Sequence, residues 1–174
     1  SSKITVLRDR EATPEGVLDA LRTCTNAHFA CHGKQTGDPS MSALKLAGGQ
    51  PLTLRKLMAT RRSGAHRELA VLSACETATG DADVPDEGIH LAAGMLALGF
   101  RGVIGTMWGV HDVDAPKVMK VFYERVVDPE TGSPDASRAA WALHEAVQDW
   151  RMTMSDPYEA SSVLRWSTFI HMGV

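Results

Sequence analysis

Short apolar runs alternate along the chain with longer stretches whose apolar residues recur at helical spacing, and this alternation constrains the fold more than any other feature. The runs that we expect to form buried strands cover 27–31, 69–72, 102–107 and 166–172. The helical stretches cover 14–21, 54–58, 89–98, 118–125 and 139–150. Because parallel strands are joined by crossovers of about helical length, strands that alternate with helices predict a mostly parallel sheet with helices on both faces. The expected fold class is therefore α/β, a three-layer sandwich.

Local signals mark several element ends. Thr13 and Thr53 are suited to cap the helices that follow them, and Gly99 is suited to end the third helical stretch. A hairpin is expected over 44–52, where two adjacent glycines supply the turn. The segment 128–137 contains Pro, Gly and Ser, which indicates a linker within the domain.

The length and composition exclude several classes of protein. A chain of 174 residues has the size of one domain, and its 44% hydrophobic and 22% charged residues are typical of a globular protein. With 18 basic against 21 acidic residues the formal charge is −3, which argues against nucleic acid as a partner. No apolar stretch approaches the ~20 residues that span a bilayer, and no signal-type segment opens the chain, so we expect a cytoplasmic protein without a membrane partner. The odd count of cysteines, which are Cys24, Cys31 and Cys75, suits a reducing compartment.

Residues with catalytic potential follow the predicted strands, at the edge where open parallel sheets carry their active sites. His32 ends the strand at 27–31, and Cys75 follows the strand at 69–72. If these strands are neighbours, about 5 Å apart, the imidazole can take the proton of the thiol and create a nucleophilic thiolate. The alternative is that Cys75 is a small buried residue and His32 a turn residue, and spacing alone does not decide between the two.

The sequences around these residues carry a family resemblance. H-F-A-C-H-G at 28–33 and V-L-S-A-C-E-T at 71–77 resemble the paired signatures of the CHAT domain, a branch of the caspase-like cysteine peptidases that includes metacaspases and separases. The resemblance continues through 39–44, 88–108 and 166–173, and the sequence is most similar to those of fungal members. It spans nearly the whole chain, with both signatures in the family's order.

The resemblance implies a caspase-like fold and a cysteine endopeptidase that needs no cofactor or metal. The family's histidine before Gly and its cysteine before Glu form a catalytic dyad, and these positions are His32 and the nucleophile Cys75 in this chain. The backbone N–H groups of Gly33 and Cys75 would form the oxyanion hole. The implied function is cleavage of protein substrates in a regulated cell-death or defence pathway. The alternative is a catalytically silent caspase-like module that serves binding or assembly within a larger sensor protein.

The loop at 108–114 is the candidate determinant of substrate choice. The corresponding loop of caspase-like peptidases forms a wall of the pocket for the residue before the scissile bond, and separases have a similar W-x-x-x-D-x-D pattern whose acidic groups receive arginine. By this resemblance Trp108 borders the pocket, and Asp112, or secondly Asp114, binds a basic substrate residue through a charge-assisted hydrogen bond. The alternatives are that Asp114 caps the helix beginning near Ala115 and that Trp108 is a core residue.

A metal site is not expected from the H-x-x-C-H pattern at 28–32. On a strand Cys31 points away from His28 and His32, so we expect Cys31 in the core and His28 packed or hydrogen-bonded under the site. By the resemblance to metacaspases, the carboxylates at 81–87 leave calcium dependence open, although the segment lacks the spacing of an EF-hand.

The chain begins close to an apolar run at 4–7, whereas CHAT domains carry a further strand and helix before the corresponding segment. We therefore expect residues 1–174 to form a single CHAT domain, a C-terminal fragment of a larger protein that lacks an N-terminal strand-helix element. Its expected partners are a protein or peptide substrate and a separate N-terminal chain or sensor domain.

Overall fold

The computed structural model describes residues 4–34, 36, 38–60, 66–73 and 88–174. A four-stranded sheet in the order β1-β5-β6-β7 forms its centre, with β1, β5 and β6 parallel and β7 antiparallel to β6. These strands are β1 (Ala27–Phe29), β5 (Arg67–Leu72), β6 (Phe100–Thr106) and β7 (Phe169–Gly173).

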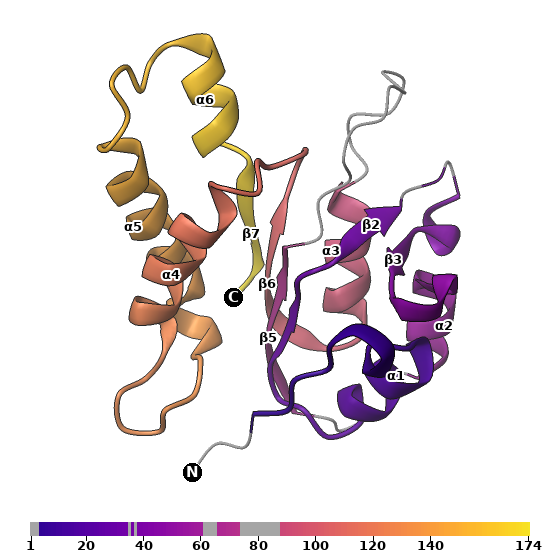
Figure 1. Ribbon diagram of the computed structural model, residues 1–174. Coiled ribbons are helices and arrows are strands. Elements are labelled where there is room, and N and C mark those ends of the chain that lie inside the picture. Colours follow the sequence, from indigo (N-terminus) through magenta and orange to yellow (C-terminus); the bar gives the residue numbers. More distant parts are fainter. Residues whose placement is uncertain (1–3, 35, 37, 61–65, 74–87) are drawn as a thin grey trace.

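Helices cover both faces of this sheet (Figure 1). The helices on one face are α1 (Pro14–Leu21), α2 (Leu54–Ala59) and α3 (Gly88–Ala97). Those on the other are α4 (Ala115–Val126) and α5 (Ala139–Arg151), and α6 (Ala160–Trp166) follows α5 at the upper left of the view. The predicted α/β fold, a mostly parallel sheet between helical layers, is confirmed.

A second, smaller sheet lies beside α2 and is antiparallel, in the order β2-β3-β4. Its strands are β2 (His32–Lys34), β3 (Ala43–Lys45) and β4 (Pro51–Thr53). The predicted hairpin is confirmed, and its glycines adopt positive φ angles of 78° and 73°, which side chains rarely tolerate. Four short 3-10 helices complete the described elements: η1 (Asp9–Glu11), η2 (Pro39–Met41), η3 (Ala47–Gly49) and η4 (Ala136–Arg138).

Residues 69–72 of β5 are buried on both faces of the sheet, which explains why they form a continuous apolar run. Ala70 and Leu72 pack into the core cluster that includes residues of α1, α2 and α3. Leu69 and Val71 pack into the cluster that includes residues of α4 and α5. Alternate side chains of one strand thus join the two helical layers to the sheet.

Helix ends follow the predicted local chemistry. The Thr13 hydroxyl accepts a hydrogen bond from the backbone N–H of Gly16 at 3.1 Å, and Thr53 accepts from that of Lys56 at 3.3 Å. Gly99, just after α3, has a φ angle of 103°. The two threonine caps satisfy N–H groups that the first turn of a helix leaves unpaired.

The predicted strand at 27–31 is wrong in its last two residues. Pairing of β1 with β5 ends at Phe29, opposite Leu72, and the chain then crosses to the small sheet, where His32 pairs with Lys45. His32 therefore begins β2 instead of ending β1. A bend at Cys31 separates the two strands. Alternation of apolar and polar residues does not show which strand a segment pairs with, so it could not reveal the change of partner.

The predicted strand at 166–172 is also corrected. Trp166 is the last residue of α6, and the strand begins at Phe169. The sequence did not predict α6, because Glu159, which caps its first turn by accepting from Ser161 and Ser162, is not among the preferred capping residues. Residues 4–7 lie outside both sheets.

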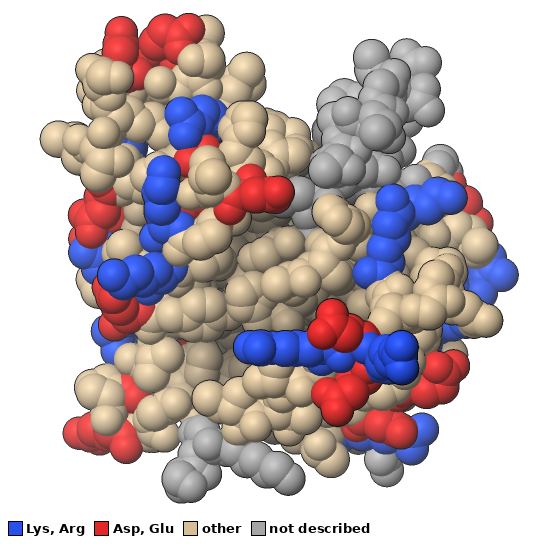
Figure 2. Space-filling model, viewed as in Figure 1, with Lys and Arg blue, Asp and Glu red and all other residues tan. Residues whose placement is uncertain are grey.

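Among the helices described, none combines the length and the apolar character needed to cross a membrane. Figure 2 shows basic and acidic side chains interspersed on the face that it presents.

Candidate active site

The carboxyl ends of β1, β5 and β6 point to the same end of the central sheet (Figure 1). The chain continues from them into 30–32, into Ser73 and into 107–114. Cys75 and the acidic loop at 81–87 lie outside the described residues. Ser73 is therefore the last described residue before the predicted nucleophile.

His32 and Gly33 lie in β2, just beyond the end of β1. The His32 side chain is exposed, whereas Gly33 is buried and pairs with Leu44 of β3. The predicted dyad partner is outside the described residues, so the arrangement of His32 with Cys75 stays a prediction, and so does the oxyanion hole.

His28 of β1 makes two side-chain hydrogen bonds at this edge. Its Nε2 lies 3.0 Å from the Ser73 Oγ, and its Nδ1 lies 3.0 Å from the Tyr123 hydroxyl of α4. The His28 and Tyr123 rings also stack, with centroids 5.6 Å apart and planes at 27°. The expectation that His28 packs or hydrogen-bonds is confirmed by these contacts, whereas its place under the catalytic site stays a prediction. The sequence did not indicate either partner.

Both rings are neutral at ordinary pH. His28 keeps part of its surface open to solvent, but the protein around its ring removes enough water to lower its pKa, and the same effect raises the pKa of the half-buried Tyr123, because the charged form of each is disfavoured. A neutral imidazole offers one donor and one acceptor, which matches the two hydroxyl groups that face it.

The two described cysteines are structural. Cys24 and Cys31 are partly buried against the core cluster on the α1 side, as expected for Cys31. Burial raises the pKa of both thiols, that of Cys31 to about 11. Neither therefore forms a thiolate readily. No three His, Cys, Asp or Glu side chains within the described ranges are grouped to hold a metal ion.

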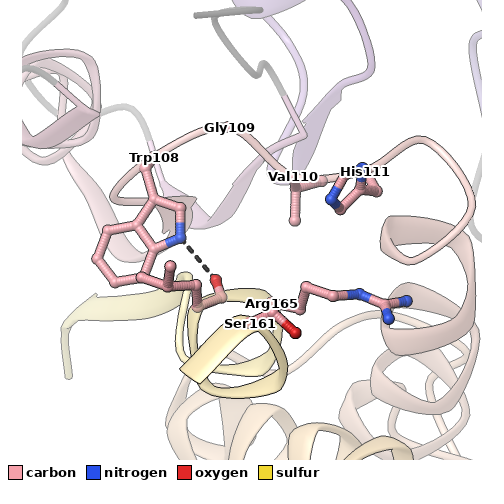
Figure 3. A pocket seen from close by; sticks show the side chains of 7 residues that line it. Trp108, Gly109, Val110, His111, Ser161 and Arg165 are labelled. Atoms are coloured by element: carbon pink, nitrogen blue, oxygen red, sulfur yellow. Dashed lines mark hydrogen bonds between the residues drawn. The ribbon is translucent and has the colours of Figure 1, made fainter. Parts of the chain in front are cut away.

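A pocket of about 270 Å³ lies between the loop at 107–114 and α6 (Figure 3). It is lined by Trp108, Gly109, Val110, His111, Ser161, Leu164 and Arg165. The Trp108 indole N–H donates to the Leu164 carbonyl oxygen at 2.7 Å, and the Trp108 carbonyl accepts from the Thr168 hydroxyl at 3.1 Å. Trp108 is 40% exposed, so it borders this pocket and is not a core residue.

The two candidate aspartates of this loop differ in their surroundings. Asp114 is 1% exposed, and its carboxylate accepts two hydrogen bonds from Arg165, at 2.8 and 2.7 Å, with the Lys117 ammonium 3.4 Å away. Burial by itself would raise the pKa of Asp114, but Arg165 and then Lys117 outweigh it and hold the pKa below its usual value.

Asp114 occupies the N-cap position of α4 as the alternative interpretation expected, but its side chain makes no capping hydrogen bond. Asp112 is exposed on the loop and is not among the residues lining the pocket. Sequence reasoning missed Arg165, since it lies 51 residues from Asp114 and only the fold joins them.

The family model of the CHAT domain matches residues 1–174, the whole chain. The comparison with curated proteins finds no match.

Proposed function

The chain belongs to the CHAT domain family and thus to the caspase-like proteins, and we propose that it is a cysteine endopeptidase with Cys75 as nucleophile and His32 as general base. The match over the whole chain, together with the His-Gly and Cys-Glu pairs at 32–33 and 75–76, carries this proposal. The raised pKa values of Cys24 and Cys31 support it, because they leave Cys75 as the thiol available for activation.

In this mechanism His32 takes the proton of the Cys75 thiol, and the thiolate attacks the carbonyl carbon of the scissile peptide bond. The backbone N–H groups of Gly33 and Cys75 stabilise the oxyanion. The C–N bond breaks as His32 returns the proton to the leaving amine, which leaves an acyl-enzyme. Water activated by His32 then hydrolyses the thioester and frees the thiol.

Specificity for a basic residue is the second part of the proposal. Asp112 is exposed on the loop that forms one wall of the pocket, with Trp108 near the start of that loop. Asp114 is the weaker candidate, because its carboxylate already binds Arg165. The physiological setting proposed from the family is regulated cell death or defence, with an upstream sensor domain or chain as partner.

A digest of a peptide library by the purified full-length parent protein tests the function. We expect cleavage after Arg or Lys that is abolished in Cys75→Ala and slowed by ~10²–10⁴-fold in His32→Ala. Cys24→Ala serves as the matched control, since it removes another thiol outside the site and should leave cleavage unchanged.

A second assay separates an enzyme from a silent module. A peptide electrophile ending in Arg should modify Cys75 stoichiometrically in the wild type. Failure of both cleavage and labelling would contradict the peptidase and favour a binding or assembly module.

A further inference from the structure

His28 connects three separate parts of the fold at the end of the sheet. It lies in β1, opposite Val71 of β5, and its ring bonds to Ser73 beyond β5 and to Tyr123 of α4. Side chains two residues apart on an extended chain share a face, so Ser73 continues the face of Val71. The imidazole therefore meets Ser73 on the side of the sheet that α4 covers.

This contact begins where the backbone pairing stops. The ladder between β1 and β5 ends at Phe29 and Leu72, so Ser73 is the first residue beyond it. Its hydroxyl is held at 3.0 Å by a ring that is itself held by a second hydrogen bond and by stacking on Tyr123. The side chains thus continue the contact between the two segments one residue beyond the ladder.

The donors and acceptors of this trio match. The ring nitrogen that carries the proton donates to the hydroxyl facing it, and the other nitrogen accepts from the second hydroxyl. Because Ser73 and Tyr123 can each donate or accept, both bonds form with either tautomer. The ring is thereby fixed in orientation by groups from two different elements.

We propose that His28 is a positioning residue for Cys75, acting through Ser73 and anchored by Tyr123. This inference rests on the proposed function. Cys75 follows Ser73 by two residues, so their Cα atoms are at most about 7 Å apart, and we expect a shift at Ser73 to reach the thiol. A displacement of about 1 Å at a reacting group can cost ~10²-fold in rate.

Four variants separate the two hydrogen bonds. The amide group of Asn can take the place of the Nδ1 atom of histidine, so His28→Asn keeps the hydrogen bond to Tyr123. The amide group of Gln can take the place of the Nε2 atom, so His28→Gln keeps the hydrogen bond to Ser73. Ser73→Ala and Tyr123→Phe remove the hydroxyls in turn. His144→Gln is the matched control, because His144 is exposed and lies on a different element, α5.

In the full-length protein we expect Ser73→Ala and His28→Asn to lower kcat by ~10- to 100-fold with KM changed less than about threefold. His28→Gln should lose less than about fivefold. The double variant Ser73→Ala/His28→Asn should be no slower than either single variant, since both remove the same contact.

Alkylation of Cys75 by iodoacetamide gives a readout that needs no peptidase activity. Its rate at each pH is followed by mass spectrometry of the peptide containing Cys75. If Ser73 positions the thiol beside His32, Ser73→Ala and His28→Asn should shift the pH profile upward, toward the ordinary thiol pKa of about 8.5. The profile of His144→Gln should match that of the wild type.

The outcomes distinguish the inference from the proposed function. A shifted profile in a protein that cleaves no peptide supports the positioning role and contradicts the peptidase. Normal cleavage and unshifted profiles in Ser73→Ala and His28→Asn overturn the positioning role and leave the peptidase standing. A lower melting temperature without a change in kcat or in the alkylation profile also overturns it, because His28 would then be only structural.

Discussion

Arg165 of α6 donates two hydrogen bonds, of 2.8 and 2.7 Å, to the buried carboxylate of Asp114 at the start of α4. The two residues are 51 positions apart in the chain, so this contact joins two distant helices. Paired bonds between guanidinium and carboxylate are charge-assisted and geometrically specific. The contact lies beside the pocket, and Trp108 adds a bond to the backbone of α6. The loop at 107–114 is therefore fastened to α6 at both of its ends.

We expect Asp114→Asn to lower the free energy of unfolding by roughly 1–3 kcal/mol, measured by urea denaturation at pH 7. This is less than the ~3–5 kcal/mol of a fully enclosed pair, because the Arg165 side chain is partly open to water. The difference from wild type should be complete above the unfolded-state pKa of about 3.9 and disappear as the pH falls through the lowered pKa of Asp114. Glu124→Gln, an exposed charge change on the same helix, should have little effect.

The substitution Asp112→Asn tests substrate choice. If Asp112 receives the basic residue, the variant should lose about tenfold or more in the ratio of kcat/KM for Arg over Leu substrates, with its melting temperature unchanged. Asp19→Asn, at an exposed position on α1, is the charge control. An unchanged ratio would show that Asp112 does not bind the basic residue of the substrate.

The lowered pKa of His28 predicts a pH dependence of stability. Below the unfolded-state value of about 6.5 the unfolded chain binds a proton that the folded ring does not, so stability falls as the pH drops from there through the folded pKa. The groups that face the ring, Ser73 and Tyr123, are uncharged in this range. Urea denaturation at pH 7 and pH 5 measures this effect. Between these two pH values the free energy of unfolding should fall less in His28→Gln than in the wild type. Equal falls in the two proteins would contradict a lowered pKa of His28.

Close packing of α3 on α2 makes Gly94 sensitive to size. A Cβ atom at this position would overlap the Cδ1 atom of Leu54, which is the end of a flexible and partly exposed side chain, so Gly94→Ala should destabilise the protein by only ~1 kcal/mol in thermal or urea unfolding. The overlap disappears in Leu54→Ala, where the added Cβ gives only the helix-favouring effect of alanine over glycine. The double variant should then be at least as stable as Leu54→Ala, and a further loss would show that another neighbour is responsible.

The candidate site was predictable from the sequence only in part. The sequence indicates the loop at 108–114, and residues 108–111 of it line a pocket, whereas the role of this loop in binding substrate stays a prediction. The second wall of the pocket is α6, which the sequence does not predict. The capping residue of this helix is atypical, and its last residue, Trp166, was expected to begin the final strand. The dyad of His32 and Cys75 came from the family resemblance and stays a prediction.

Features that depend only on neighbouring residues follow from the order of residues along the chain. Thr13 and Thr53 start their helices because each hydroxyl needs only an N–H three residues away, and β5 is recognisable because the side chains of 69–72 are all buried in a core. Tertiary structure decided the rest. The switch of partner after Phe29 and the bond between His28 and Tyr123, 95 residues apart, require segments that meet only in the folded chain. Spacing carries no record of such contacts, because their energy comes from groups that packing brings together and not from the order of residues along the backbone.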